Sequence, residues 1–397
     1  MSTPAKRNYL QVLLVGSLFF LWGLSYGLLD VLNKHFQETL HLSKSESSFL
    51  QFAYFGAYFI MAIPAARLMS RRGYSLGVLV GLLLFALGAL AFFPAVAIGG
   101  FVPFLAALFV LACGLAFLET AANPLMTVLG PPESGTFRLN LAQSFNGVGS
   151  IVGPLLGILF LGKTGAEGND SLLSVYLMIA TAVITVAFLF RRAELPEPAE
   201  ESEQSDFKES YWFLINDNRF RISVIAQACY VAAQVGVAAY FINYATEVVS
   251  GLSNGHAASY LSGAMLLFTL GRFTGSFLLK FTDAGMLLLS YGAINILLCA
   301  FCIYAEGMPA LVALMAVFFF ESIMFPTIFS LGIRDLGKHR KAGSSLLVMS
   351  IVGGALIPFL MGYIADEWST PIAYSVPLVC FVAVSYFGFY SRQLSKP

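Results

Sequence analysis

The sequence FLETAANPLMTVLG (residues 117–130) recurs in pattern 202 residues later as FFESIMFPTIFSLG (319–332). Both stretches place a glutamate inside an apolar run, a proline five residues after it, and a glycine six residues after the proline. The short sequence SIVG likewise occurs at 150–153 and again at 350–353. A repeat in the same order along the chain predicts two halves of one architecture, related by an axis along the normal of a membrane.

The composition predicts a membrane protein. Of the 397 residues, 58% are apolar and only 11% are Asp, Glu, Lys or Arg, whereas about a quarter of the residues in a soluble domain are charged. A hydrocarbon core about 30 Å thick needs about 20 apolar residues per helix, and windows of this length predict twelve spans. The predicted spans are 9–32, 47–69, 74–94, 100–129, 138–162, 172–190, 221–249, 257–280, 286–305, 309–332, 343–364 and 371–390.

The basic residues support this count. If the N-terminus is inside, only Lys34, Lys44 and Lys163 of the 22 Lys and Arg residues lie outside. The others lie on cytoplasmic loops or at the cytoplasmic ends of helices, as the positive-inside rule requires. Both chain termini are therefore predicted to be cytoplasmic.

Several other classes of protein are disfavoured. The net charge is zero, so nothing indicates nucleic-acid binding. The five cysteines fall inside predicted spans and the four histidines in predicted loops, so no cofactor, metal site or catalytic centre is expected. The first apolar run is long enough to span and has no small-residue cleavage site, which predicts a retained helix and not a signal peptide.

One long polar interruption divides the chain. Residues 194–209 hold seven acidic residues and two prolines, a composition that predicts a flexible or partly helical cytoplasmic linker. The predicted domains are an N-terminal six-helix bundle (1–192), the acidic linker (193–218) and a C-terminal six-helix bundle (219–397). Folds built from such repeats bind their substrates near the bilayer midplane, between the repeats.

Two acidic residues of the first half are candidates for proton coupling. Asp30 lies toward the outer end of the first span, where it is either a helix-end carboxylate in water or a proton-binding group that faces a cavity. Glu119 follows apolar residues, and Asn123 lies one helical turn further on the same face. No Lys or Arg lies at a matching depth in this half, so a functional role is favoured over a structural ion pair.

Amide side chains inside the spans are candidates for substrate binding, because each offers two donors and an acceptor to a hydroxyl group. The alternative is a hydrogen bond between helices. For Gln143 this alternative is as well supported as substrate binding, and for Asn146 it is better supported. The candidate amides are Asn123, Gln143, Asn146, Gln227 and Gln234.

Other charged residues are assigned to gating or to structure. Glu321 corresponds to Glu119 in the repeat, and Arg272 is its expected partner if the two lie at the same depth. The basic loop between the second and third spans either controls gating or anchors the inner side. Its arginines are Arg67, Arg71 and Arg72.

Twelve spans in two halves, an acidic linker and a basic loop resemble the major facilitator superfamily. Within it, nearly the whole chain resembles the fucose permease family of fucose–galactose–glucose proton symporters. The resemblance implies that Asp30 is the proton-coupling aspartate, Glu119 a cavity glutamate tied to sugar and proton, and Gln143 a sugar-binding glutamine. The segments that carry the resemblance are FFLW (19–22) with Asp30, LETAANP (118–124), RLNLAQ (138–143), SIMFPTIFSL (322–331) and GSS (343–345).

The chain also departs from the family pattern. Tyr26, Gly27 and Leu29 stand where fucose-handling members carry asparagines, and Phe325 replaces a tyrosine of some relatives. Gln234 stands where many members have a carboxylate. Proton coupling fits these changes, but the identity of the sugar is not predicted.

The prediction is an all-α membrane protein that acts as a secondary active transporter. It would carry a monosaccharide (a hexose or deoxyhexose such as fucose, glucose or galactose) together with protons by alternating access. Protonation of Asp30 and Glu119 would allow the loaded carrier to reorient. We expect a functional monomer that crosses the bacterial inner membrane many times, whose partners are the sugar, protons and the lipid bilayer.

Two alternatives stay open, and a third is disfavoured. A drug or metabolite:proton antiporter of the same fold is favoured by the glycine-proline motif at 149–157 and by an aromatic content of 14%. Sodium-coupled sugar symport is a variant, because a carboxylate serves either cation. A membrane-embedded enzyme would need clustered catalytic side chains or metal ligands, and the sequence offers none.

Overall fold

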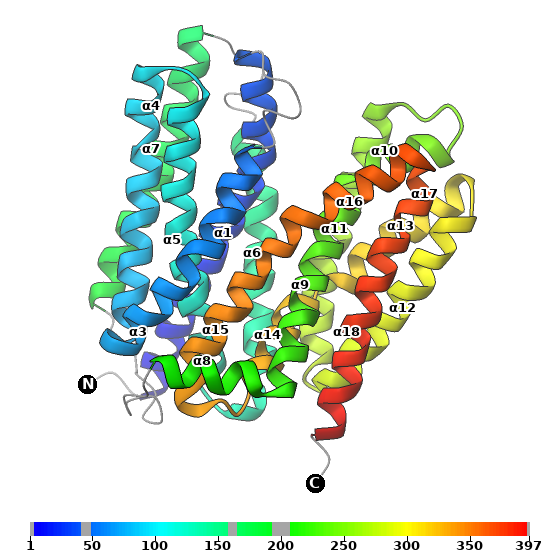
Figure 1. The fold of residues 1–397 in the computed structure, drawn as a ribbon. Helices are drawn as coiled ribbons and strands as arrows, with labels where there is room; N and C mark the ends of the chain where they lie inside the picture. Colours follow the sequence, from blue (N-terminus) through cyan, green and yellow to red (C-terminus); the bar gives the residue numbers. More distant parts are fainter. Residues whose placement is uncertain (1–3, 41–48, 158–164, 193–206, 395–397) are drawn as a thin grey trace. The chain divides into compact units, whose positions relative to one another are not determined.

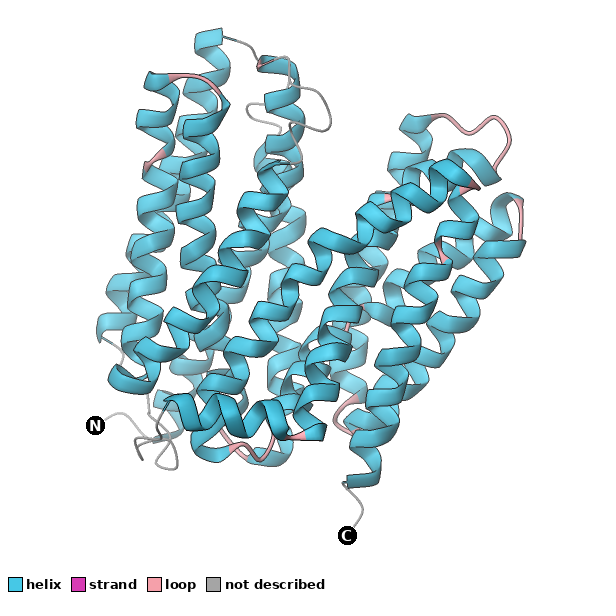
Figure 2. Cartoon of the chain, in the orientation of Figure 1, coloured by secondary structure: helices cyan, strands magenta, loops and turns pink. Residues whose placement is uncertain are grey.

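The computed structural model describes residues 4–40, 49–157, 165–192 and 207–394, which form helices and loops without a strand (Figures 1 and 2). The helices of the first half are α1 (Pro4–Thr39), α3 (Phe49–Leu90), α4 (Phe92–Ile98), α5 (Phe101–Val128), η1 (Pro132–Ser134), α6 (Gly135–Gly157) and α7 (Gly165–Arg192). Those of the second half are α8 (Phe207–Asn216), α9 (Asn218–Ala239), α10 (Phe241–Val248), α11 (Asn254–Leu278), α12 (Ala284–Tyr304), α13 (Gly307–Glu321), α14 (Met324–Ile333), η3 (Gly337–His339), α15 (Arg340–Met349), η4 (Ser350–Val352), α16 (Gly353–Glu367), α17 (Thr370–Ala373) and α18 (Ser375–Leu394).

The predicted all-helical membrane architecture is confirmed. In the described part of the chain, nine helical stretches are long and apolar enough to cross a membrane. The first, Phe49–Ile98, holds two predicted spans, which are separated by a kink at Gly73 with φ of 83°, a conformation that glycine adopts without a steric penalty. Helix α1 covers the predicted span 9–32, and α6 covers residues 138–157 of the span 138–162, whose last residues lie outside the described part of the chain.

Three predicted spans of the second half are interrupted. The breaks lie at Tyr240 between α9 and α10, at Ser322 and Ile323 between α13 and α14, and at the 3-10 turn η4 between α15 and α16. Glu321 is the last residue of α13, so the candidate acid lies directly at a break. Broken helices in transport folds are typical of the places where substrates and ions bind.

The contacts of the chain divide it into two compact units. Unit 1 consists of Met1–Pro132, Phe145–Tyr211 and Leu336–Met349, and unit 2 of Glu133–Ser144, Trp212–Asp335 and Ser350–Pro397. Each unit therefore includes one segment from the opposite half of the sequence. These two exchanged segments are separated in the sequence by about the length of the internal repeat. They therefore occupy corresponding positions in the two halves. The domain boundaries expected from the sequence remain a prediction, and most of the linker lies outside the described residues.

Polar side chains help to hold both exchanged segments. In unit 2, Thr136 Oγ1 lies 2.8 Å from Ser330 Oγ, and Asn140 Nδ2 donates to Thr327 Oγ1 over 3.2 Å. In unit 1, α15 packs on α3 and α5, and the ammonium of Lys341 lies 4.7 Å from the centre of the Tyr74 ring. The exchanged segments are thus fixed by polar side chains and not by apolar packing alone.

Inside unit 1, helices α1 and α6 meet with their backbones in contact. A Cβ on Gly23 would lie 1.9 Å from the carbonyl oxygen of Asn146, and a Cβ on Gly149 would lie 2.2 Å from that of Phe20. Gly153 is similarly close to α1. Small residues spaced four apart permit this approach between membrane helices, so the glycine-proline motif at 149–157 serves helix packing.

We expect Gly149→Ala to lower the thermal unfolding temperature of the purified protein in detergent, because its Cβ would overlap the α1 backbone. Gly16→Ala is the matched control, since Gly16 also lies on α1 and has nothing within 4 Å of its Cβ position. Equal unfolding temperatures of the two variants would contradict the close packing of α1 on α6.

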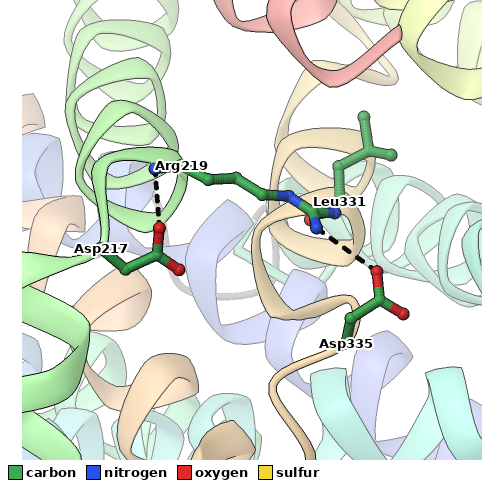
Figure 3. A network of polar contacts seen from close by, with 4 residues as sticks. All are labelled: Asp217, Arg219, Leu331 and Asp335. Atoms are coloured by element: carbon green, nitrogen blue, oxygen red, sulfur yellow. Dashed lines mark hydrogen bonds and ion pairs between the residues drawn. The ribbon is translucent and has the colours of Figure 1, made fainter. Parts of the chain in front are cut away.

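A small polar network joins the start of α9 to the end of α14 in unit 2 (Figure 3). The side chain of Asp217 caps α9 by accepting from the Arg219 amide over 2.9 Å. The Arg219 guanidinium lies 3.3 Å from Asp335 Oδ2 and donates to the Leu331 carbonyl over 3.4 Å. Asp335 has φ of 66°, a left-handed conformation that aspartate and asparagine tolerate better than β-branched residues.

Replacement of Asp335 separates its two contributions. Asp335→Asn removes the charge and keeps the backbone preference, so stability should fall by less than about 1 kcal/mol, as is usual for an exposed ion pair. Asp335→Val should destabilise more, because valine is strained at positive φ. Chemical unfolding of both variants measures this order, and a larger loss in the asparagine variant would show that the ion pair dominates.

Candidate functional site

Glu119 lies on α5 in the interior of unit 1, where its side chain is 2% exposed. Neither carboxylate oxygen makes a hydrogen bond within the described residues, although the amide of Asn123 lies one turn away and interacts with it at longer range. A buried carboxylate without hydrogen bonds is costly. The chain therefore retains at this position a group that does not serve stability.

A small cavity adjoins Glu119. Aromatic and aliphatic side chains of α1 and α5 form its walls, and the Phe19 and Trp22 ring centres lie 6.2 Å apart. The lining residues are Leu18, Phe19, Trp22, Leu118, Glu119 and Ala122. The cavity has a volume of about 10 Å³, room for about one water molecule, and it brings one carboxylate together with two aromatic rings.

Two tyrosines of α3 complete this polar cluster. The Tyr54 and Tyr58 hydroxyls lie 3.5 Å apart in the buried interior. The Trp22 indole interacts with both hydroxyls, and both lie within electrostatic range of Glu119. These tyrosines were not predicted from the sequence, although hydroxyl-bearing residues four apart on one helix face are a recognisable signal.

The residue after Glu119 carries a second polar contact that the sequence analysis missed. Pro124 has no N–H, so it cannot bond to the Thr120 carbonyl four residues before it. Ser344 Oγ on α15 donates to this carbonyl over 2.8 Å. The proline thus exposes an acceptor beside Glu119, and the exchanged segment 336–349 supplies its donor.

The repeat reproduces this arrangement in unit 2. Pro326 cannot donate to the Ser322 carbonyl, which accepts instead from Arg272 Nε over 3.3 Å. Arg272 also donates from Nη1 to the Gln143 carbonyl over 2.5 Å and to Gln143 Oε1 over 3.4 Å. The structure therefore brings together two predicted site residues, Gln143 and Arg272, from α6 and α11.

Glu321 is fully buried, and neither of its oxygens makes a hydrogen bond within the described residues. It lies within electrostatic range of Arg272, the partner expected from the sequence, but also of Cys299 and Tyr374. The Arg272 guanidinium donates to the Ser322 and Gln143 carbonyls and to the Gln143 amide oxygen. Glu321 thus shares the charge of Arg272 without a hydrogen-bonded ion pair.

Two amides of α9 differ in their surroundings. Gln227 is fully buried, and neither of its amide atoms makes a hydrogen bond within the described residues, whereas Gln234 is half-buried. On the same helix the buried Tyr230 ring lies 6.3 Å from that of Phe325. Gln227 is therefore the better placed of the two predicted amides to receive a ligand in unit 2.

The remaining predicted residues are placed individually. Asn146 contacts α1 in unit 1, and its carbonyl accepts from Ser150 Oγ over 3.0 Å. Asp30 belongs to α1, but its side chain lies outside the described residues. The basic side chains that end the first half of α3 are exposed. They are Arg67, Arg71 and Arg72.

Within the described residues, no group of three or more His, Cys, Asp or Glu side chains could hold a metal ion. The five cysteines are free thiols. Cys302 donates from Sγ to the Ala310 carbonyl over 3.7 Å, a contact between neighbouring helices.

Residues 15–351 match the Major Facilitator Superfamily. The chain is 39% identical to the L-fucose-proton symporter of Escherichia coli K12, with 98% of this chain and 94% of that protein covered. It is 36% identical to the glucose/galactose transporter of Brucella abortus, with 97% and 95% covered. The crystal structure of the transporter FucP in the outward conformation is similar, with a TM-score of 0.88, 38% identity and coverage of 97% of this chain and 99% of that chain. The chain therefore belongs to the major facilitator superfamily and, within it, to the fucose permease family.

Proposed function

We propose that this protein is a secondary active transporter that carries a monosaccharide together with protons. The observation that carries the proposal is Glu119, a buried carboxylate that makes no hydrogen bond to the described residues and lies beside a small cavity lined by Trp22. The similar transporters named for fucose, glucose and galactose support a hexose or deoxyhexose as the substrate.

The chemistry of Glu119 fits a coupling site. A carboxylate that makes no hydrogen bond to the described residues can take up a proton without losing any of their contacts. Once neutral, it costs less to enclose in an apolar cavity, so the loaded carrier can close and reorient. Asp30 is the second proposed coupling residue, on the strength of the sequence resemblance.

The sugar would be held by amides and aromatic rings. Asn123 lies beside Glu119, and Asn146 on α6 faces α1, which also carries Trp22. Gln143 and Gln227 present buried amide nitrogens without hydrogen bonds within the described residues. We infer that Gln234 binds the sugar at the margin of the site. We further infer that four charged residues act in gating or in structure: Arg67, Arg71, Arg72 and Glu321.

The proposal extends to the setting of the protein. We infer that it works as a monomer in a bacterial inner membrane, with both termini in the cytoplasm and protons as the coupling ion. The distribution of Lys and Arg along the chain supports this orientation.

Uptake by proteoliposomes under an inward proton gradient tests the function. We expect one of L-fucose, D-galactose or D-glucose to accumulate in vesicles that contain the wild-type protein. Asp30→Asn and Glu119→Gln should abolish accumulation while sugar exchange across the membrane persists, because exchange returns each carrier without deprotonation.

Glu367→Gln is the matched control, because Glu367 is an exposed glutamate at the end of α16, and it should accumulate sugar like the wild type. Accumulation of sugar under a sodium gradient alone would show that the coupling ion is sodium and not the proton. No uptake of any of the three sugars under either gradient would contradict the sugar assignment and favour an exporter.

A further inference from the structure

Arg272 is a buried cation on α11, 5% exposed, to which the proposed function assigns no role. Its guanidinium donates to the carbonyl and to the side-chain oxygen of Gln143 and to the Ser322 carbonyl. The ring of Phe268 lies 4.6 Å from the guanidinium carbon. Because a guanidinium is planar and its donors point in fixed directions, these contacts hold it in one orientation.

This orientation decides which way the Gln143 amide points. A guanidinium only donates, so the amide atom that faces it must be the oxygen. The amide nitrogen is then directed elsewhere, and it makes no hydrogen bond within the described residues although Gln143 is only 1% exposed. A buried donor without an acceptor is unfavourable, so this nitrogen is the atom that an incoming ligand would satisfy.

We propose that Arg272 is a positioning residue that orients Gln143, so that the amide N–H donors of Gln143 recognise an acceptor oxygen of the substrate. This inference rests on the proposed function, because it takes Gln143 as a sugar contact. It adds the chemical sense of the contact: the protein donates, and a hydroxyl or ring oxygen of the sugar accepts.

The break between α13 and α14 explains how Arg272 is held. Pro326 has no N–H, so the Ser322 carbonyl accepts no helical hydrogen bond from the residue four positions later. The carbonyl oxygen is therefore available to accept from the Arg272 guanidinium. Lysine could not replace this arrangement, because an ammonium is a compact charge that lacks the planar fork. Arg272→Lys should therefore keep the charge and lose the orientation of Gln143.

A double-mutant cycle tests the inference. The probe is the sugar selected by the uptake assay from L-fucose, D-galactose and D-glucose, and the readouts are its dissociation constant and the half-saturation and maximal rate of exchange. We expect Arg272→Met and Gln143→Ala each to weaken binding by about tenfold, the size of one hydrogen bond to a charged or buried group. The double variant should be no weaker than Gln143→Ala, and the maximal exchange rate should change little.

Lys280→Met is the matched control. Lys280 follows α11, and its ammonium lies 4.7 Å from the centre of the Phe137 ring on α6, so it joins the same two helices without contact to Gln143. It should leave the dissociation constant unchanged. Thermal unfolding of every variant shows whether the protein is folded. Arg272→Lys, with the same expected loss of affinity, replaces Arg272→Met in the cycle if Arg272→Met does not fold.

Sugar analogues test the direction of the hydrogen bond in the wild-type protein. At the hydroxyl that accepts from Gln143, replacement by hydrogen should weaken binding more than replacement by fluorine, which still accepts weakly. In Gln143→Ala this difference should disappear.

Additive effects of Arg272→Met and Gln143→Ala would overturn the positioning role and leave the transport function intact, as would normal affinity in both Arg272 variants. Unchanged sugar affinity in Gln143→Ala would instead contradict the proposed sugar site.

Discussion

The structure depends on a backbone carbonyl that a proline leaves without its helical hydrogen bond, next to a buried glutamate in each half. Pro124 and Pro326 each lack the N–H that would close the helix onto the carbonyl of the residue after the acid. Each freed carbonyl takes a side-chain donor from another helix, Ser344 Oγ in unit 1 and Arg272 Nε in unit 2. One repeated sequence thus produces, in both halves, a buried acid beside a cross-helix hydrogen bond.

The two halves use this arrangement differently. In unit 1 the acid adjoins a cavity with Trp22, and the donor is a neutral hydroxyl, so it brings no positive charge to Glu119. In unit 2 the donor is a guanidinium, so Glu321 lies within range of a cation that also binds Gln143. This asymmetry favours Glu119 for a change of protonation and the arginine of unit 2 for the orientation of the substrate contact.

The sequence predicted the spans, the repeat and the family, because apolar length, charge asymmetry and the Glu–Pro pattern are local properties of the chain. The helix breaks before Met324 and at residues 350–352 were not predicted, since a hydropathy window averages over them. Charge alone predicts that Arg272 pairs with Glu321, whereas in the structure Arg272 donates hydrogen bonds to Gln143 and Ser322. Tyr54 and Ser344 were missed because their partners lie on other helices, which periodicity alone does not identify.

The central claim is that sugar and protons enter together, and a pH electrode tests it most directly. Sugar is added to de-energised cells that contain the protein, in lightly buffered medium, while the external pH is recorded. We predict an immediate rise in external pH that an uncoupler abolishes and that Glu119→Gln does not produce. Entry of labelled sugar without any change in external pH would contradict proton coupling.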